Sequence, residues 1–185
     1  MSTSNTEVVT GKVRISYEHI FEAVAIQEGQ TPKYSASFIV PKSDKVTLRK
    51  IQSAIEAAKA AGKSIWGGKI PPNLKLPLRD GDADRPDDAA YKDAYFINAN
   101  SSRQPAVVDR NRNEVLKRDE VYSGCYVRAD INFYPFNKNG NRGIAAGLGA
   151  VQKWADGDPL TGGHVDVDVA FADELPDDTD ADFLS

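Results

Sequence analysis

Apolar and polar residues alternate most regularly between Tyr126 and Tyr134. Every second position of this stretch is apolar, at Val127, Ala129, Ile131 and Phe133. Such period-2 alternation is typical of a strand with one buried face and one solvated face. Turn residues follow at 137–143 and a small, glycine-rich segment at 144–151, so the pattern predicts a long β-hairpin.

Shorter alternating segments predict further strands at residues 11–21, 33–40, 94–100 and 107–108. A helix is expected over Asp44–Ala61. Its apolar face, at helical spacing, is formed by Leu48, Ile51, Ile55 and Ala58. Ser43 is the expected N-cap of this helix, and Gly62 follows its last residue.

Together these elements predict a mainly β protein, in which an antiparallel sheet of five or six strands curls into an OB-fold-like barrel with one α-helix. SH3-like barrels and other α+β sheets fit the same pattern and stay open as alternatives. We expect a flexible N-terminal arm over residues 1–10, the barrel domain over 11–155, and a linker with a disordered acidic C-terminal tail over 156–185. Within the tail, residues 165–171 are a candidate edge strand.

The composition of the 185-residue chain fits one domain, since 41% hydrophobic residues are enough for one core. No segment approaches the roughly 20 apolar residues of a membrane span, and the N-terminus has no signal-peptide pattern. We therefore expect a soluble, intracellular protein without a membrane partner. Cys125 is interpreted as a small core residue. His19 and His164 are too isolated to suggest a metal site, and no cofactor is expected.

The net charge of −4 conceals a division of charge along the sequence. Residues 1–155 contain all 23 Lys and Arg but only 17 of the 27 acidic residues, and residues 156–185 contain the other 10. The body is therefore a net cation that attracts polyanions, and the tail resembles such a polyanion electrostatically. A tail that only improves solubility is the alternative interpretation.

A barrel surface that combines aromatic rings with cations suits single-stranded nucleic acid, because rings stack on any base and cations follow the phosphates. The cations in or beside the predicted loops are Lys69, Lys75, Arg79, Arg103, Lys138, Arg142 and Lys153. Among the aromatic residues, Phe136 lies at a strand end close to two of these cations, and Tyr134 lies on the solvated face. Packing inside the protein is expected for Phe133, Trp66 and Trp154.

An enzymatic alternative rests on the acidic segment 79–88. Asp80, Asp82 and Asp84 resemble the start of a calcium loop, but Arg85 and Tyr91 stand where that loop requires glycine and glutamate. The same carboxylates are candidates for binding magnesium in a nuclease or repair enzyme, although no Glu, His or Lys partner stands at a recognisable spacing. A third possibility is a protein-interaction module whose basic body binds an acidic protein.

Six motifs follow one another along the chain: YSASFIVPKSD, IWGGKIP, LKLPLRDGD, YFINANS, VYSGCYVRADINFYPFNKNGNRGIAAGLGAVQK and the acidic C-terminal end. In this order they resemble a phage replication family of single-stranded DNA-binding proteins, long catalogued as a domain of unknown function. The resemblance covers the chain from about Lys12 to its end. More distantly, the pattern is similar to the single-stranded DNA-binding protein of short-tailed coliphages, an OB-fold followed by an acidic tail that ends in phenylalanine.

This resemblance implies a protein that is not an enzyme and that coats single-stranded DNA during phage DNA replication and recombination in the host cytoplasm. It implies base stacking by Phe136, with Tyr17 or Phe21 of the first strand as a further ring. The tail would compete with DNA and dock a polymerase or helicase through Asp177, Asp178, Asp180, Asp182 and Phe183. Here Leu184 and Ser185 follow Phe183, whereas the compared tails end in phenylalanine.

Overall fold

The hairpin that the sequence predicts is the longest feature of the fold. In the computed structural model, which describes residues 5–25 and 28–160, β7 (Tyr126–Lys138) pairs with β8 (Asn141–Ala155) along almost its whole length. The turn between them places Asn139 and Gly140 at positive φ, as the turn chemistry of this stretch requires.

The remaining elements are short strands, one long helix and single helical turns. The strands are β1 (Glu7–Val9), β2 (Val13–Val24), β3 (Lys33–Pro41), β4 (Leu78–Asp80), β5 (Ala94–Ser101) and β6 (Ala106–Val108). The helices are α1 (Lys45–Ala61) and the one-turn α2 (Gly81–Asp84). The 3₁₀ turns are η1 (Gly62–Trp66), η2 (Ala89–Tyr91) and η3 (Arg118–Glu120).

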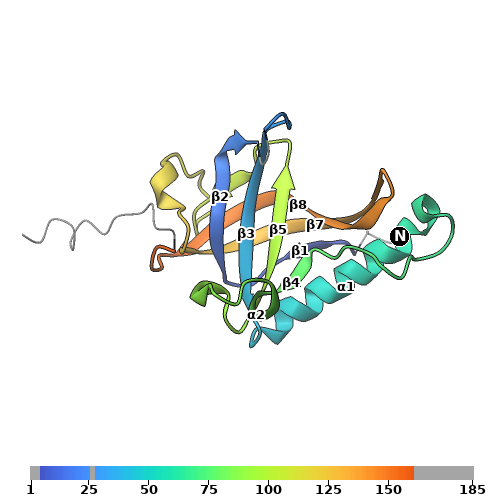
Figure 1. Cartoon of the computed structure of the whole chain (residues 1–185). Coiled ribbons are helices and arrows are strands. Elements are labelled where there is room, and N and C mark those ends of the chain that lie inside the picture. Colours follow the sequence, from blue (N-terminus) through green and yellow to red (C-terminus); the bar gives the residue numbers. More distant parts are fainter. Residues whose placement is uncertain (1–4, 26–27, 161–185) are drawn as a thin grey trace, which may run out of the picture.

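Five strands close into a ring in the order β2, β3, β5, β8, β7 and back to β2 (Figure 1). Neighbouring strands are antiparallel except β5 and β8, which run parallel and meet at Asn100 and Gly147. This ring confirms the predicted OB-fold-like barrel. The sheet has eight strands where five or six were expected, because β1, β4 and β6 add short pairings to β7, β5 and β8.

The core of the barrel follows the predicted alternation. On β7, the buried residues are Val127, Ala129, Ile131 and Phe133. The predicted apolar face of α1 is buried and belongs to the same core. Trp66 and Cys125 also lie in this core, as expected. None of the described helices is long and apolar enough to cross a membrane.

Two boundaries differ from the prediction. Asp44, rather than Ser43, caps α1, because the Asp44 carboxylate accepts a hydrogen bond from the Thr47 amide at 3.1 Å. Glu7–Val9 form β1 beside β7 although the sequence predicted a flexible arm over 1–10, and the reason is that Val8 is buried in the core. The candidate edge strand 165–171 lies outside the described residues.

Candidate nucleic-acid interface

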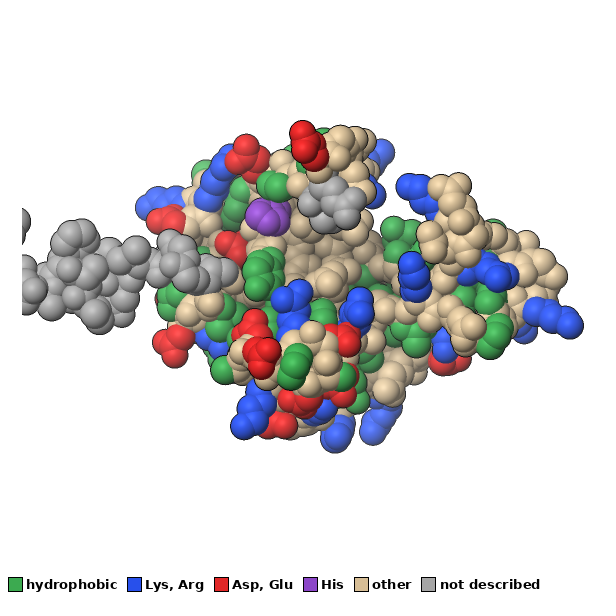
Figure 2. Space-filling view, in the orientation of Figure 1, with side chains coloured by type: hydrophobic (Ala, Val, Ile, Leu, Met, Phe, Trp, Pro, Cys, Tyr) green, Lys and Arg blue, Asp and Glu red, His purple; other side chains and the backbone are tan. Residues whose placement is uncertain are grey.

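One side of the barrel presents a row of small polar side chains. Residues opposite each other in neighbouring strands share a face of the sheet, and the register of β2, β3 and β5 aligns their outward residues. Those that reach solvent are His19 on β2, Ser35 on β3, and Asn98 and Asn100 on β5. Ser16 and Ser37 pair on the same face but are buried, and their hydroxyls accept hydrogen bonds from the hydroxyls of Ser123 at 3.4 Å and Tyr91 at 3.2 Å. We call His19, Ser35, Asn98 and Asn100 the polar floor. In Figure 2 the middle of this face is tan, the colour of polar side chains and backbone, and Lys and Arg side chains stand below it and to its right.

The polar floor continues across the closure of the barrel to an aromatic ring. Asn100 of β5 pairs with Gly147 of β8, and a Cβ placed at Gly147 would lie 3.5 Å from the ring of Tyr134. Tyr134 is 41% exposed and projects from the outer face of β7, as the alternating pattern predicts. The outer face of four neighbouring strands therefore leads to a ring that is open to solvent.

Beyond Tyr134 the two long strands extend as an arm, formed by residues 135–144. Phe136 lies on this hairpin arm, where its ring edge would be 3.0 Å from a Cβ at Gly143. Lys75 runs alongside: its amide donates to the Arg142 carbonyl at 3.1 Å, and its carbonyl accepts from the Ile144 amide at 2.8 Å.

A side chain at Gly143 would come within 2.4 Å of the Lys75 carbonyl oxygen, so only glycine allows this close pairing. The structure thus brings the predicted cations Lys75, Lys138 and Arg142 to the hairpin arm that carries Phe136. In the strand register Lys138 is on the same face as Phe136, whereas Arg142 pairs with Asn137 and is on the other face. Lys69 is exposed in the preceding loop, residues 67–77.

Below the polar floor, Arg85 lies over three aromatic rings. Its guanidinium carbon is 5.4 Å from the ring centre of Tyr17, 4.9 Å from that of Tyr91 and 5.3 Å from that of Phe96. Tyr17 is 48% exposed and has a positive φ of 50°, which turns its ring out of the regular strand pattern. Sequence reasoning selected Tyr17 but missed Arg85, which gave no signal except that it interrupts a calcium-like loop.

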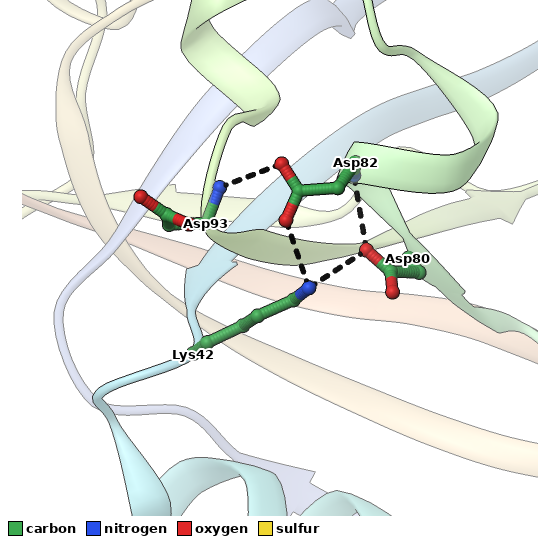
Figure 3. Close-up of polar contacts among 4 residues, drawn as sticks. All are labelled: Lys42, Asp80, Asp82 and Asp93. Atoms are coloured by element: carbon green, nitrogen blue, oxygen red, sulfur yellow. Dashed lines mark hydrogen bonds and ion pairs between the residues drawn. The ribbon is translucent and has the colours of Figure 1, made fainter.

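The segment that carries Arg85 is fastened to β3 by Lys42 (Figure 3). The Lys42 ammonium lies 3.0 Å from Asp80 and 2.9 Å from Asp82, and the second oxygen of Asp82 accepts from the Asp93 amide at 3.1 Å. Hydrogen bonds from Lys42 hold the pKa of Asp80 and of Asp82 below their usual values, and the two carboxylates raise the pKa of Lys42. We call Lys42, Asp80 and Asp82 the latch.

The same contacts weigh against the enzymatic alternative. Asp80 and Asp82 face the Lys42 ammonium, and Asp84 pairs with Arg79 at 2.7 Å. A cation already occupies the place that a magnesium ion would need. Within the described residues, no group of three or more His, Cys, Asp or Glu side chains is arranged to hold a metal ion.

The other predicted residues lie apart from this face or are already paired. Arg79 points outward from β4, opposite Phe96, but is engaged by Asp84. Phe21 packs against the core and lines a cavity of about 400 Å³ beside β6. Arg103 is exposed in the turn after β5.

Lys153 lies near the far end of β8, where its ammonium pairs with Asp156. Burial lowers the pKa of Lys153, but the hydrogen bond and the charge of Asp156 outweigh this effect and raise it. The tail residues Asp177, Asp178, Asp180, Asp182 and Phe183 lie outside the described part of the chain.

The sequence and the fold are similar to those of known phage proteins. A sequence profile of the family described as Enterobacter phage Enc34, ssDNA-binding protein, matches residues 6–184. Protein p50 of Acyrthosiphon pisum secondary endosymbiont phage 1 is 32% identical over 169 residues, which cover 86% of this chain and 89% of that protein.

Among solved structures, the fold is similar to the single-stranded DNA-binding protein from bacteriophage Enc34 in complex with ssDNA. The TM-score is 0.74 at 27% identity, covering 87% of this chain and 96% of that chain. It is also similar to gp2.5, a single-stranded DNA-binding protein encoded by bacteriophage T7, with a TM-score of 0.58 at 15% identity over 92% and 95% of the two chains. At that identity the second likeness shows the fold alone. Because the family profile spans nearly the whole sequence, the chain belongs to the phage single-stranded DNA-binding protein family represented by Enterobacter phage Enc34.

Proposed function

We propose that this protein binds single-stranded DNA without sequence preference along the outer face of β2, β3 and β5 and onto the hairpin arm. One observation carries the proposal. The outer face leads from the polar floor across the closure of the barrel to the exposed ring of Tyr134, and β7 continues from Tyr134 into the hairpin arm with Phe136 and Lys138. A relative that is 27% identical was solved in complex with ssDNA.

Each part of this surface has a role in the proposed binding. Tyr134, Phe136 and Tyr17 offer rings on which bases stack, and Lys75, Lys138 and Arg142 offer charges to the phosphates. The serine and asparagine side chains of the polar floor can both donate and accept hydrogen bonds. Every base and every sugar has donor or acceptor groups that can pair with them in some orientation. Stacking together with phosphate contacts gives affinity without base readout.

The acidic tail is proposed to compete with DNA for this surface. Leu160, the last described residue, packs against Ile39, Tyr91, Ala94 and Phe96, which cover the lower part of the outer face. Its amide donates to the Ser123 carbonyl at 3.0 Å. The chain that follows contains eight acidic residues and no Lys or Arg. It therefore starts beside the proposed DNA surface with the charge of a competitor.

In a phage-infected cell, such a protein would protect single strands during DNA replication and recombination in the host cytoplasm. The tail, released when DNA is bound, would be free to dock a polymerase or helicase through its acidic residues and Phe183. The members of this family bind single-stranded DNA and are not enzymes, so we expect no turnover of the bound strand.

Fluorescence anisotropy tests the proposal. A labelled oligo-dT of about 20 nucleotides and its duplex would be titrated with the whole chain and with a form that ends at Leu160, at several salt concentrations. We expect salt-dependent binding to the single strand, weaker binding to the duplex, and tighter binding by the shortened form. Absence of binding by both forms would refute DNA binding. Equal affinity of the two forms at low salt would refute competition by the tail, but it would not refute DNA binding.

A further inference from the structure

The Arg85 guanidinium is a cation without a matching carboxylate in the described part of the chain. Within residues 5–25 and 28–160, no salt bridge to Arg85 is found. The acidic residues that surround it in the sequence are engaged elsewhere: Asp82 by Lys42, Asp84 by Arg79, and Asp88 by the amide of Ala90. Asp87 is exposed to solvent.

The surroundings of Arg85 favour a bound anion. Its guanidinium rests on Tyr91 and Phe96, which are buried and meet edge to face with ring centres 5.0 Å apart. Arg85 itself is half-buried. A cation that is partly removed from water attracts an anion more strongly than an exposed lysine does, because the local dielectric constant is lower. The planar guanidinium can give two parallel hydrogen bonds to a phosphate or a carboxylate.

The acidic tail begins close to this cation. Leu160 packs against the cluster that contains Tyr91 and Phe96, the rings beneath Arg85. Asp166 is six residues further along the chain, and six residues extend at most roughly 20 Å. Tail carboxylates are therefore tethered within reach of Arg85.

The start of the tail is held firmly at this end of the barrel. Arg14 donates to the Asp158 carbonyl at 2.6 Å, and the Tyr122 hydroxyl donates to the Gly157 carbonyl at 2.8 Å. Gly124, at a φ of 115°, allows the Asp158 carbonyl to lie where a side chain would otherwise be, 2.0 Å from the position of a Cβ. The last described residues of the chain are thus held against the barrel.

We propose that Arg85 is an anion site shared by the two competitors, which binds a phosphodiester of single-stranded DNA or, in its absence, a carboxylate of the acidic tail. The proposal rests on the proposed function and deepens it, because it assigns the competition to one side chain. The tail then inhibits DNA binding by neutralising a cation at the lower edge of the DNA surface, beside Tyr17.

A double-mutant design tests this assignment with four proteins: the whole chain and the form ending at Leu160, each with Arg85 or with Arg85→Gln. The affinity for oligo-dT is measured by anisotropy at low salt. In the shortened form, we expect Arg85→Gln to weaken binding about tenfold and to reduce the salt slope by about one phosphate contact. In the whole chain, Arg85→Gln should reduce the affinity for oligo-dT by a smaller factor, because the substitution also removes the cation to which the inhibitory tail binds. The factor by which shortening tightens binding should therefore shrink.

Arg110→Gln is the matched control. Arg110 also lies over an aromatic ring, 4.2 Å from the centre of Trp154, but beside β6 and the end of β8. The Arg110→Gln substitution should change neither the affinity for oligo-dT nor the factor by which shortening tightens binding. Thermal unfolding shows whether Arg85→Gln is folded. If it is not, Arg85→Lys, which keeps the charge without the planar fork, replaces it and should give an intermediate loss.

The outcomes separate the two proposals. If the folded Arg85 variant binds oligo-dT as tightly as the parent in the shortened form, Arg85 does not contact DNA and the inference is overturned. If DNA binding weakens but the effect of the tail is unchanged, the sharing of one site is overturned. If neither parent form binds DNA, the proposed function itself fails, whatever Arg85 does.

Discussion

The Trp66 indole donates a hydrogen bond to the backbone carbonyl of Phe136 at 3.0 Å. This contact joins the end of α1 to the hairpin arm, since Trp66 closes the 3₁₀ turn that continues the helix. The Asn137 side chain adds a second link, donating to the Ile65 carbonyl at 3.2 Å. A buried tryptophan from one element thus fixes the base of the arm on which the proposed stacking ring stands.

Replacing this tryptophan should loosen the arm. Trp66→Phe keeps a ring in the core but leaves the Phe136 carbonyl without its donor, so the free energy of unfolding should fall by about 1 to 3 kcal/mol. Binding to oligo-dT should weaken as well, because Phe136 is less firmly placed. Urea unfolding and anisotropy measure the two effects. Trp154→Phe, which retains a ring beneath Arg110, is the comparison. DNA affinity that stays at the parent value would show that the arm does not need this anchor.

Removing the rings of the proposed interface should weaken binding on every sequence alike. Tyr134→Ala and Phe136→Ala each remove one stacking platform, which is worth about 1 to 3 kcal/mol, or roughly 5- to 150-fold in affinity. Titrations with oligo-dT, oligo-dA and oligo-dC measure this loss. Leu116→Ala serves as the control, because Leu116 is exposed and lies between β6 and β7, outside the strand that carries Tyr134 and Phe136. A loss confined to one base would instead indicate direct base readout.

The latch should stabilise the protein only while its carboxylates are ionised. The pKa of Asp80 and of Asp82 is lowered in the folded state by Lys42, so their contribution is present above the unfolded pKa of about 4 and is lost as the pH falls through the folded values. Lys42→Met should therefore lower the melting temperature at pH 7 and have little effect near pH 2.

The segment that carries Arg85 should also become more accessible to proteases in Lys42→Met, because the latch holds that segment against β3. Lys59→Met removes a comparable surface pair with Glu56 on α1 and should change proteolysis little. An equal loss of melting temperature at both pH values would show that Lys42 acts by packing rather than by charge.

Asp130 should make the protein less stable as the pH rises. Burial, together with a hydrogen bond and the charge of Glu7, raises the pKa of Asp130 to about 6. The folded state then binds more protons than the unfolded state between about pH 4 and pH 6, so stability falls across that window.

Asp130→Asn removes the partly buried carboxylate and its repulsion from the charge of Glu7. It should raise the free energy of unfolding by on the order of 1 kcal/mol at pH 7.5, after allowance for solvent screening, and leave it nearly unchanged at pH 4. Urea titrations at the two pH values measure the difference. A stabilisation of the same size at pH 4 would assign the effect to the amide itself and not to the loss of charge.

Where the hydrophobic pattern was regular, the sequence was enough to predict the structure. The alternation around Ile131 and the helical spacing of Ile51 correctly predicted the faces of β7 and α1, because burial of one face is a local and repetitive signal. The exposure of Tyr134 followed from the same period. β1 was missed because three residues with one buried valine are too short to show a period.

The lower part of the interface could not be predicted in this way. The segment that carries Arg85 has no periodicity, and its position depends on Lys42, which is some 40 residues earlier in the chain and whose partner Asp82 gives no local sign of the contact. The backbone of Tyr17 departs from the strand through a positive φ that its neighbours do not encode. Such features arise from contacts between distant segments, so only the three-dimensional structure shows them.

The closure of the barrel between β5 and β8 has a consequence for how the molecule opens. In the described part of the chain these two strands share a single register pair, Asn100 with Gly147, whereas β7 and β8 are paired along almost their whole length. This seam is therefore the weakest line of the ring, and its amide hydrogens should exchange with solvent before those of the hairpin. A strand of DNA that runs from the polar floor to Tyr134 crosses the seam and would hold its two edges together. The bound nucleic acid would then stabilise the pairing of β5 with β8. The greatest slowing of amide hydrogen exchange on DNA binding is therefore expected at Asn100 and Gly147.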